Sequence, residues 1–272
     1  MQDVQEPRET VQSVIRAFDI LGAFTVDRPV LGVSEIAALI RLNRTTVHRL
    51  LTTLEGCGVV QRVPESQKYT IGTQIVRLAN VFFHQSDVRS VGLPVITSLR
   101  DTTGHTAALH LRDEQDRITV AQAESRQDLR VTYPDMGKPI PLHIGAPGKA
   151  ILAHLRPDEI EHYLETVDLT PMVQGSVIDK TALRAELDRI RANGYSATSQ
   201  ERRLGVRSIA APIYSAAGAV IASVNVSAPL QRLTEEEVAG VSGLVVRAGR
   251  TISSQLGYHD DGENGHRGGA PG

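Results

Sequence analysis

The hydrophobic pattern of residues 11–73 predicts three helices followed by a hairpin. Apolar residues recur at helical spacing from Val11 to Leu21, and Gly22 ends that segment. Ser34 is a suitable N-cap for a second, short helix over residues 35–40. A third helix follows Asn43, its predicted cap, and carries the apolar stripe Val47, Leu50, Leu51 and Leu54. Residues 59–63 and 68–71 then predict two short strands around a turn.

This order of helices, tight turn and two-stranded wing predicts a winged helix-turn-helix over residues 11–73. Between Glu35 and Glu55 the chain has three arginines and no acid, which favours contact with phosphates. The alternative is that the third helix only presents a solvent-exposed face. We expect the following residues to contact double-stranded DNA: Arg41, Asn43, Arg44, Thr45, Thr46, His48, Arg49, Arg62 and Lys68.

The pattern of residues 74–99 predicts one longer linker helix. Ile75, Leu78, Ala79 and Phe82 recur at helical spacing, and such a stripe suits packing against a partner chain. Packing against the chain's own second domain is the alternative. In either case this segment is the expected connection between the two domains and a candidate for dimerisation.

Residues 100–257 mix strand-like alternation with helical segments, which predicts a second, α+β domain. Two hairpins are expected, over residues 106–124 and 208–228. Asp179 is the predicted cap of a helix that Gly194 ends, and residues 234–237 form a capping box before a final helix. Residues 1–10 are expected to be a polar tail and residues 258–272 a disordered, Gly-rich tail.

The composition narrows the function. With 41% hydrophobic and 22% charged residues and a formal net charge of −2, the chain is a folded protein without an overall basic surface. Its one cysteine, Cys57, excludes an intramolecular disulfide and suits a reducing cytoplasm. No run of about 18 apolar residues occurs, so no membrane partner is expected.

The sequence lacks the usual patterns of catalysis and metal binding. Its histidines form no His-Glu-x-x-His motif, and no Gly-x-Ser-x-Gly is present. Gly148-Lys149 is not part of a P-loop, because Leu142 and Ala150 stand where that motif needs glycine and Ser or Thr. We therefore expect no enzyme, no metal and no cofactor. An enzyme acting on a small carboxylate with an appended DNA-binding-like domain is the main alternative, and a structural adaptor is a third.

The loop of residues 143–148, followed by a helix predicted to start near Lys149, is the expected functional centre of the second domain. A Gly-rich loop that enters a helix exposes backbone N–H groups, and the helix dipole adds partial positive charge there. A carboxylate is therefore the expected guest.

Several spaced motifs resemble the IclR family of bacterial transcriptional regulators. The resembling segments, which together span roughly residues 10–257, are Ser13–Ala17, Val33–Ala37, Arg44–Leu54, Tyr69–Gly72, Pro141–His143, Gly148–Ala153, Gly194–Tyr195, Gly205–Ile213 and Val224–Pro229. The resemblance implies a DNA-binding domain, a linker helix and a GAF-like effector-binding domain. It also implies palindromic operators of catabolic operons, a small organic or aromatic acid as effector, and homodimers or homotetramers.

Carried over by position, the resemblance implies an effector pocket formed by Leu129, Thr132, Ala146, Pro147, Thr198, Val206, Ser208, Asn225 and Ser227. Hydroxyls and an amide beside apolar side chains suit a small, partly apolar acid. Pro147 lacks the N–H that other members can donate there, and Thr198 is neutral where some members carry an acid. The alternative is that these polar residues are ordinary members of a sheet that satisfy one another.

Overall fold

The computed structural model describes residues 10–85, 87–134, 136–173 and 178–259. Most of both predicted tails lies outside these ranges, and the side chains of residues 82–85, including Phe82 of the predicted stripe, are not described. The chain divides into two compact units, Met1–Gln85 and Ser86–Gly272. In the described part of the chain, no helix is both long and apolar enough to cross a membrane.

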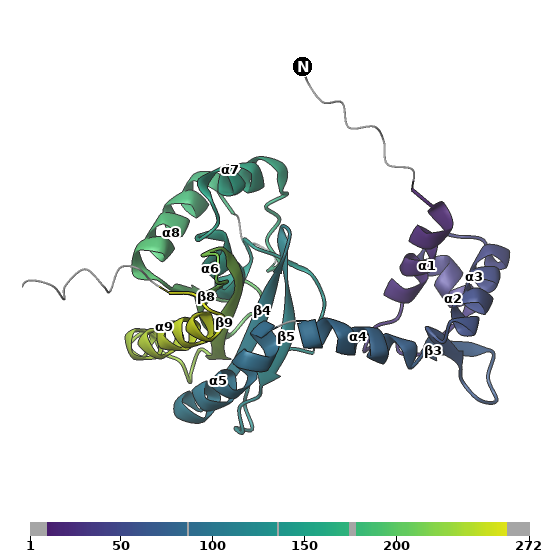
Figure 1. The fold of residues 1–272 in the computed structure, drawn as a ribbon, viewed down its shortest axis with the longest axis horizontal. Coiled ribbons are helices and arrows are strands. Elements are labelled where there is room, and N and C mark those ends of the chain that lie inside the picture. The colour runs from purple at the N-terminus through teal and green to yellow at the C-terminus, as the bar shows by residue number, and fades with distance from the viewer. Residues whose placement is uncertain (1–9, 86, 135, 174–177, 260–272) are drawn as a thin grey trace, which may run out of the picture. The chain divides into compact units, whose positions relative to one another are not determined.

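The N-terminal unit is a winged helix-turn-helix, as predicted (Figure 1). Its helices are α1 (Gln12–Gly22), α2 (Val33–Leu39), α3 (Arg44–Gly56) and α4 (Gln74–Gln85). The wing strands β2 (Val60–Arg62) and β3 (Lys68–Ile71) pair antiparallel, and β1 (Leu31–Gly32) pairs with the other edge of β3. The sequence pattern missed β1, because two residues are too few to show alternation. The core of this unit contains Ile20, Ile36, Val47, Leu51 and Tyr69.

The caps of α2 and α3 differ in how well they were predicted. Asn43 caps α3 as expected, since its Oδ1 accepts the backbone N–H of Thr46 at 2.7 Å. The prediction of Ser34 as the cap of α2 is wrong. The helix begins one residue earlier, Gly32 is its N-cap, and the carboxylate of Glu35 accepts the Gly32 N–H at 2.6 Å. An acid in the first turn thus takes the capping role that the sequence pattern assigns to a serine hydroxyl.

Replacing Asn43 with alanine is expected to lower the free energy of unfolding of the N-terminal unit by about 1 kcal/mol, because the Thr46 N–H loses its acceptor. Thermal unfolding followed by circular dichroism measures the effect. Ser34→Ala is the matched control, because Ser34 does not cap α2. Equal losses in the two variants would contradict this account of the caps.

Residues 74–85 and 87–99 of the predicted linker helix are helical in the structure, and residue 86 between them lies outside the described residues. The chain after α4 continues as α5 (Asp87–Thr103), which belongs to the C-terminal unit and buries Val88, Ile96 and Leu99 in its core. The compact C-terminal unit therefore includes residues 87–99, which the sequence pattern assigned to the linker helix.

The C-terminal unit is built on a six-stranded antiparallel sheet in the order β6-β5-β4-β9-β8-β7. Its strands are β4 (Thr106–Asp113), β5 (Asp116–Ala123), β6 (Ile140–Pro141), β7 (Ser196–Ser199), β8 (Val206–Tyr214) and β9 (Val220–Pro229). The two predicted hairpins are thus present. Besides α5, the helices are α6 (Gly145–Leu152), α7 (Pro157–Thr166), α8 (Lys180–Asn193) and α9 (Val238–Gln255).

Helices cover both faces of this sheet (Figure 1). α5 and α9 pack on one face, where residues such as Leu109, Val224 and Val226 form the main core. α6 packs on the other face, where Ala146 and Ala150 contact Ala210 of β8, and α7 and α8 form a second core beyond it. α8 is capped by Asp179 and ended by Gly194, as predicted.

The final helix, α9, starts later than its capping signal. The Thr234 N–H donates to Glu237 Oε2 at 2.8 Å, so the predicted capping contact is present. The regular helix begins only at Val238, after that turn. The capping box therefore forms a turn that precedes the helix.

The strands of the sheet separate polar from apolar residues by alternation. On β9, Ser223, Asn225 and Ser227 face α6, while Val224 and Val226 belong to the core under α5 and α9. Pairing places Ser208 of β8 opposite Ser227, and the partners of Asn225 and Ser223 across β4 are Ala108 and His110. The α6 side of the sheet therefore carries a buried polar surface.

Candidate functional site

Most of the predicted DNA-contacting residues lie exposed along α3 and just before it. Val47 and Leu51 are the buried residues of α3. Arg41, Asn43, Arg44, Thr45, His48 and Arg49 are exposed, and Thr46 is half-buried. Thr46 and Arg49 also line a groove between α3 and α1. The helix therefore presents a face of hydroxyl, imidazole and guanidinium groups, which are donors suited to phosphates and base edges.

The two predicted wing cations already have acidic neighbours. Arg62 lies 3.3 Å from Glu55 Oε2, and Lys68 Nζ lies 3.2 Å from Glu35 Oε2. The guanidinium of Arg62 also lies 5.3 Å from the ring centre of Tyr69. All four charged side chains are at least one-third exposed, so these pairs contribute little to stability and do not prevent a phosphate contact.

A cavity of about 40 Å³ lies in the C-terminal unit, on the α6 side of the sheet. Six of the predicted effector residues line it: Thr132, Pro147, Thr198, Val206, Ser208 and Ser227. Three predicted residues do not. Leu129 is 58% exposed and lies away from the lining, which corrects its placement. Ala146 and Asn225 are fully buried and lie behind the lining residues.

Asn225 is the centre of a buried hydrogen-bond network behind the cavity. Its Nδ2 lies 2.7 Å from Tyr133 Oη and 2.9 Å from both Ser208 Oγ and Ser227 Oγ. Its Oδ1 lies 2.9 Å from His110 Nε2, which must therefore carry the proton. The predicted polar residues thus satisfy one another, as the alternative interpretation held, while Ser208 and Ser227 still face the cavity.

The N-terminus of α6 differs from the prediction in two ways. The helix starts at Gly145, four residues before Lys149, because Pro147 is tolerated in a first turn. Its first N–H groups are also satisfied within the chain: the Gly145 N–H donates to Glu201 Oε2 and the Ala146 N–H to Thr198 Oγ1, each at 3.0 Å. A carboxylate does sit at this helix end, as expected from the dipole, but it is the protein's own.

Glu201 is held firmly at this position. Its Oε1 lies 2.7 Å from Lys149 Nζ, and Lys149, 5% exposed, also contacts both carboxylate oxygens of Glu186. The sequence offered no signal for this role, because Glu201 lies in a polar loop after β7. The N-terminus of α6 is therefore bonded by an acidic side chain, Glu201, as well as by the neutral Thr198.

Several lining residues were missed by sequence reasoning: Arg117, Val131, Tyr133, Gly145, Gln200, Glu201, Arg202 and Arg203. Arg117 is 1% exposed, although it follows a hairpin turn where arginines are usually solvated. Its Nη1 lies 3.0 Å from His110 Nδ1, and its Nη2 donates to the carbonyl oxygen of Ile144 at 3.3 Å. Arg117 therefore connects the cavity to the Asn225 network through His110.

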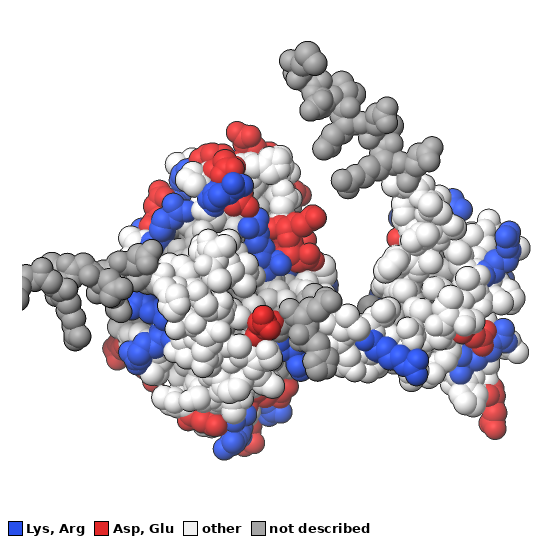
Figure 2. Space-filling model, viewed as in Figure 1, with Lys and Arg blue, Asp and Glu red and all other residues white. Residues whose placement is uncertain are grey.

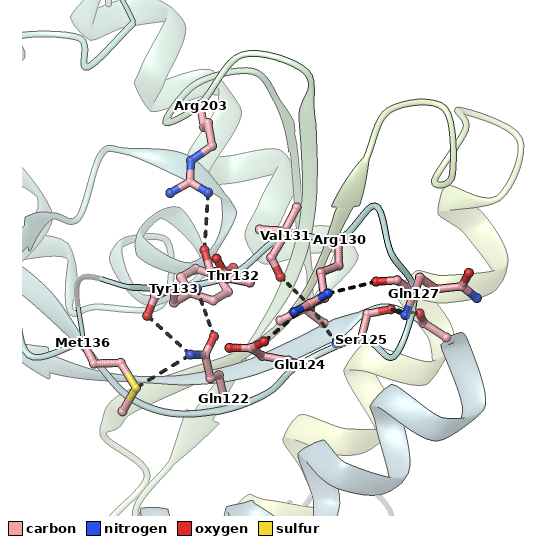
Figure 3. Close-up of polar contacts among 12 residues, drawn as sticks. Gln122, Glu124, Ser125, Gln127, Arg130, Val131, Thr132, Tyr133, Met136 and Arg203 are labelled. Carbon is pink, nitrogen blue, oxygen red and sulfur yellow. Dashed lines mark hydrogen bonds and ion pairs between the residues drawn. The ribbon is translucent and has the colours of Figure 1, made fainter.

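Residues 131–133 line one side of the cavity, and side chains fasten this segment (Figure 3). The amide of Gln122 accepts the Tyr133 N–H at 2.9 Å and donates to the Tyr133 carbonyl oxygen at 3.4 Å. Nη1 of Arg203 donates to the carbonyl oxygen of Thr132 at 3.3 Å. The figure shows that these contacts come from opposite sides of the segment, which orients Tyr133 toward the sheet.

Burial sets the protonation of the polar groups behind the cavity. It lowers the pKa of His110 well below the usual range, and the positive charge of Arg117 lowers it further, so the imidazole is neutral. Burial and then the nearby charge of Arg202 lower the pKa of Arg117 to about 9. The guanidinium remains charged at neutral pH.

The described surface carries mixed charges and lacks the ligands of a metal site. Lys and Arg are interspersed with Asp and Glu on the face of the C-terminal unit in Figure 2. Within the described ranges, no group of three or more His, Cys, Asp or Glu side chains is placed to hold a metal ion. Cys57 is exposed just after α3 and forms no disulfide.

Comparisons with known proteins agree with this architecture across both units. The family model for the IclR helix-turn-helix domain matches residues 13–64, and the model for the C-terminal domain of bacterial IclR transcriptional regulators matches residues 81–254. The chain belongs to the IclR family. The regulator BhcR of Paracoccus denitrificans is 32% identical over 89% of this chain and 86% of its own length. The regulator KdgR of Escherichia coli is 31% identical over 95% and 97%.

Solved structures of IclR-type proteins share the fold. One from Silicibacter sp. TM1040 has a TM-score of 0.78 at 27% identity and covers 91% of this chain and 97% of its own. One from Rhodococcus sp. RHA1 has a TM-score of 0.78 at 25% identity, with coverage of 91% and 98%. The predicted combination of a winged helix-turn-helix and a GAF-like α/β domain is confirmed.

Membership of the IclR family also decides between regulator and enzyme. The curated relatives are transcriptional regulators, among them the IclR repressor of Escherichia coli. The chain is a DNA-binding transcriptional regulator with a C-terminal effector-binding domain, and the alternative of an enzyme with an appended DNA-binding-like domain is set aside.

Proposed function

We propose that this IclR-family protein binds a palindromic operator as a homodimer or homotetramer in the cytoplasm and regulates a catabolic operon. In this proposal a small carboxylic or aromatic acid binds the C-terminal cavity and changes the affinity for DNA. The cavity lined by Ser208, Ser227 and three arginines is the observation that carries the effector part.

The exposed face of α3 supports DNA reading by that helix. The helix buries Val47 and Leu51, and its stable cap at Asn43 fixes where the exposed face begins. Arg44 and Arg49 are the residues on this face with the strongest donors for guanine and phosphate. We assign them to the groove, and Arg62 and Lys68 of the wing to the DNA backbone.

Exposed apolar side chains support association of the N-terminal units. At the N-cap of α1 and along the helix, one apolar stripe is between 42% and 69% exposed; it consists of Val11, Val14, Ile15 and Phe18. On α4, Val76, Leu78 and Val81 are also more than half exposed. Stripes of this kind in water suit packing against a second copy, and a two-fold dimer explains a palindromic operator.

The cavity supports a small acid as the effector. One wall presents the hydroxyls of Ser208 and Ser227, and the apolar side chains of Pro147 and Val206 also line it. An IclR homolog from Microbacterium hydrocarbonoxydans, 24% identical with a TM-score of 0.78, was solved in complex with 4-hydroxybenzoate. That likeness concerns the fold, and its ligand serves here only as one probe. The present cavity is small, so an aromatic acid requires the surrounding loops to open.

Replacing Arg44 or Arg49 with alanine is expected to weaken operator binding by about tenfold, because each removes a base or phosphate contact. A DNA site selected from a random pool by the wild-type protein supplies the probe, and fluorescence anisotropy measures Kd at several salt concentrations. A residue that contacts phosphate also reduces the salt dependence by about one unit.

Arg28→Ala is the matched control for this experiment, because Arg28 is an exposed arginine of the same unit outside α3 and the wing. Its Kd is expected to equal that of the wild type. Wild-type affinity in both the Arg44 and the Arg49 variants would contradict the assignment of α3 as the reading helix.

A further inference from the structure

Arg117 is a buried cation without a carboxylate partner in the described part of the chain. It is 1% exposed, and its hydrogen bonds go to His110 and to the carbonyl oxygen of Ile144, both neutral. Its Nε has no hydrogen-bond partner among the described residues. Burial of an unpaired charge is costly, so a buried arginine in this state has an unmet preference for an anion.

The carboxylate in the lining of the cavity pairs with Lys149 and not with Arg117. The lining residues include three guanidinium groups, Arg117, Arg202 and Arg203, and one carboxylate, Glu201. Glu201 is already engaged by Lys149 at 2.7 Å and by the Gly145 N–H at 3.0 Å. The positive charge of Arg202 acts on Arg117 strongly enough to lower its pKa. Arg202, whose guanidinium carbon lies 5.5 Å from the ring centre of Tyr133, lines the same cavity, so its charge adds to that of Arg117 at an anion held there.

The backbone leaves room at this point. Gly145 has a positive φ of 71°, and a Cβ built on it would lie 3.9 Å from Arg117 Nη2 and 4.0 Å from Arg202 Cβ. Arg117 and Arg202 thus meet at the first residue of α6.

We propose that Arg117 binds the carboxylate of the effector, with Arg202 next to the same anion. The inference rests on the proposed function, because it names the charged group of the ligand and its partner within that cavity. The bound carboxylate completes the hydrogen bonds of the guanidinium. Through His110 it is connected to Asn225, whose neighbours Ser208 and Ser227 face the rest of the ligand.

Thermal unfolding with formate, the smallest carboxylate, tests the proposal. A cavity of about 40 Å³ holds roughly three water-sized groups, so formate fits without rearrangement. Sodium formate is compared with sodium chloride at equal ionic strength, and formamide is the neutral analogue. At a formate concentration tenfold above its Kd, the melting temperature of the wild type is expected to rise by about 3–6 °C relative to chloride. Formamide is expected to give no such rise.

Arg117→Gln is expected to abolish the formate shift, whereas Arg117→Lys retains the charge and part of the shift. Arg130→Gln is the matched control, because Arg130 is exposed, pairs with Glu124 and lies outside the cavity lining. It is expected to shift as the wild type does. If Arg117→Gln does not fold, as judged by circular dichroism, the comparison of formate with formamide on the wild type and on Arg117→Lys decides the question.

Two results would overturn the proposal: a wild type that formate stabilises no more than chloride does, or an Arg117→Gln variant with the full formate shift. Fluorescence anisotropy with the selected DNA site measures whether an acid changes DNA affinity, and this readout distinguishes failure of the anion site from failure of the proposed function. If pyruvate or 4-hydroxybenzoate changes DNA affinity equally in wild type and Arg117→Gln, the anion site is wrong and effector control stands. If formate, pyruvate and 4-hydroxybenzoate bind through Arg117 without changing DNA affinity, the anion site stands and control by these acids fails.

Discussion

Gly148→Ala is expected to lower the free energy of unfolding of the effector-binding unit by about 3 kcal/mol. A Cβ on Gly148 would lie 2.3 Å from the carbonyl oxygen of Leu142 and 2.8 Å from its carbonyl carbon. These are backbone atoms that cannot rotate away, so α6 would have to move. Such a movement would also separate Ala146 and Ala150 from Ala210 on the sheet. Urea unfolding followed by far-UV circular dichroism measures the loss.

Gly240→Ala is the matched control, because Gly240 is also helical and a Cβ on it would meet no atom of the described residues within 4 Å. Alanine is the better helix former, so stability is expected to stay the same or rise slightly. Equal unfolding midpoints for Gly148→Ala and the wild type would show that α6 does not pack as closely on the Leu142 backbone as described.

Lowering the pH from 7.5 to 5.5 is expected to destabilise the effector-binding unit. Burial is the largest cause of a lowered pKa in His105, His110, His143 and His154. The unfolded chain takes up protons near the ordinary pKa of 6.5, while in the folded chain the lowered pKa values make these imidazoles take up protons only at lower pH. The contribution of these histidines to the free energy of unfolding is therefore present above pH 6.5 and is lost as the pH falls below this value. His110, fully buried, alone accounts for about 1.4 kcal/mol over this range.

Chemical unfolding at pH 7.5, 6.5 and 5.5 measures this dependence, and His110→Gln reduces its slope because glutamine does not titrate. The paired acid Glu159 does not interfere. Arg112 lowers the pKa of Glu159 to about 2, so its contribution is lost only below about pH 4.5. A stability that stays constant or rises between pH 7.5 and 5.5 would contradict the neutral, buried state of these histidines.

Local signals in the sequence were sufficient for most of the fold. Caps such as Asn43 and Asp179, and the alternation of the two large hairpins, are properties of a few neighbouring residues and survive in the structure. The errors concern features that depend on distant contacts. The membership of α5 in the C-terminal unit follows from its packing on the sheet, and the pairing of Leu31 with Tyr69 follows from the folded wing.

The family resemblance predicted six of the residues that line the cavity. It did not predict lining residues such as Arg117, whose role depends on burial in the folded chain. Arg112 and Arg117 are opposite each other in the same hairpin. Arg112 forms an ion pair with Glu159, whereas Arg117 is enclosed beneath α6. Nothing in the sequence around either arginine distinguishes the two, because the difference comes from elements far along the chain. The same is true of Glu201, which reaches α6 from the loop after β7.

The alternation along β9 has a consequence for how regulators of this kind diversify. Asn225 and Ser227 face the cavity side, and Val224 and Val226 pack under α5 and α9. The residues of β9 that determine which ligand binds thus alternate along the strand with the residues that stabilise the core. A descendant of this protein can acquire a new inducer by exchanging one or two odd-numbered residues while the even-numbered ones preserve the scaffold.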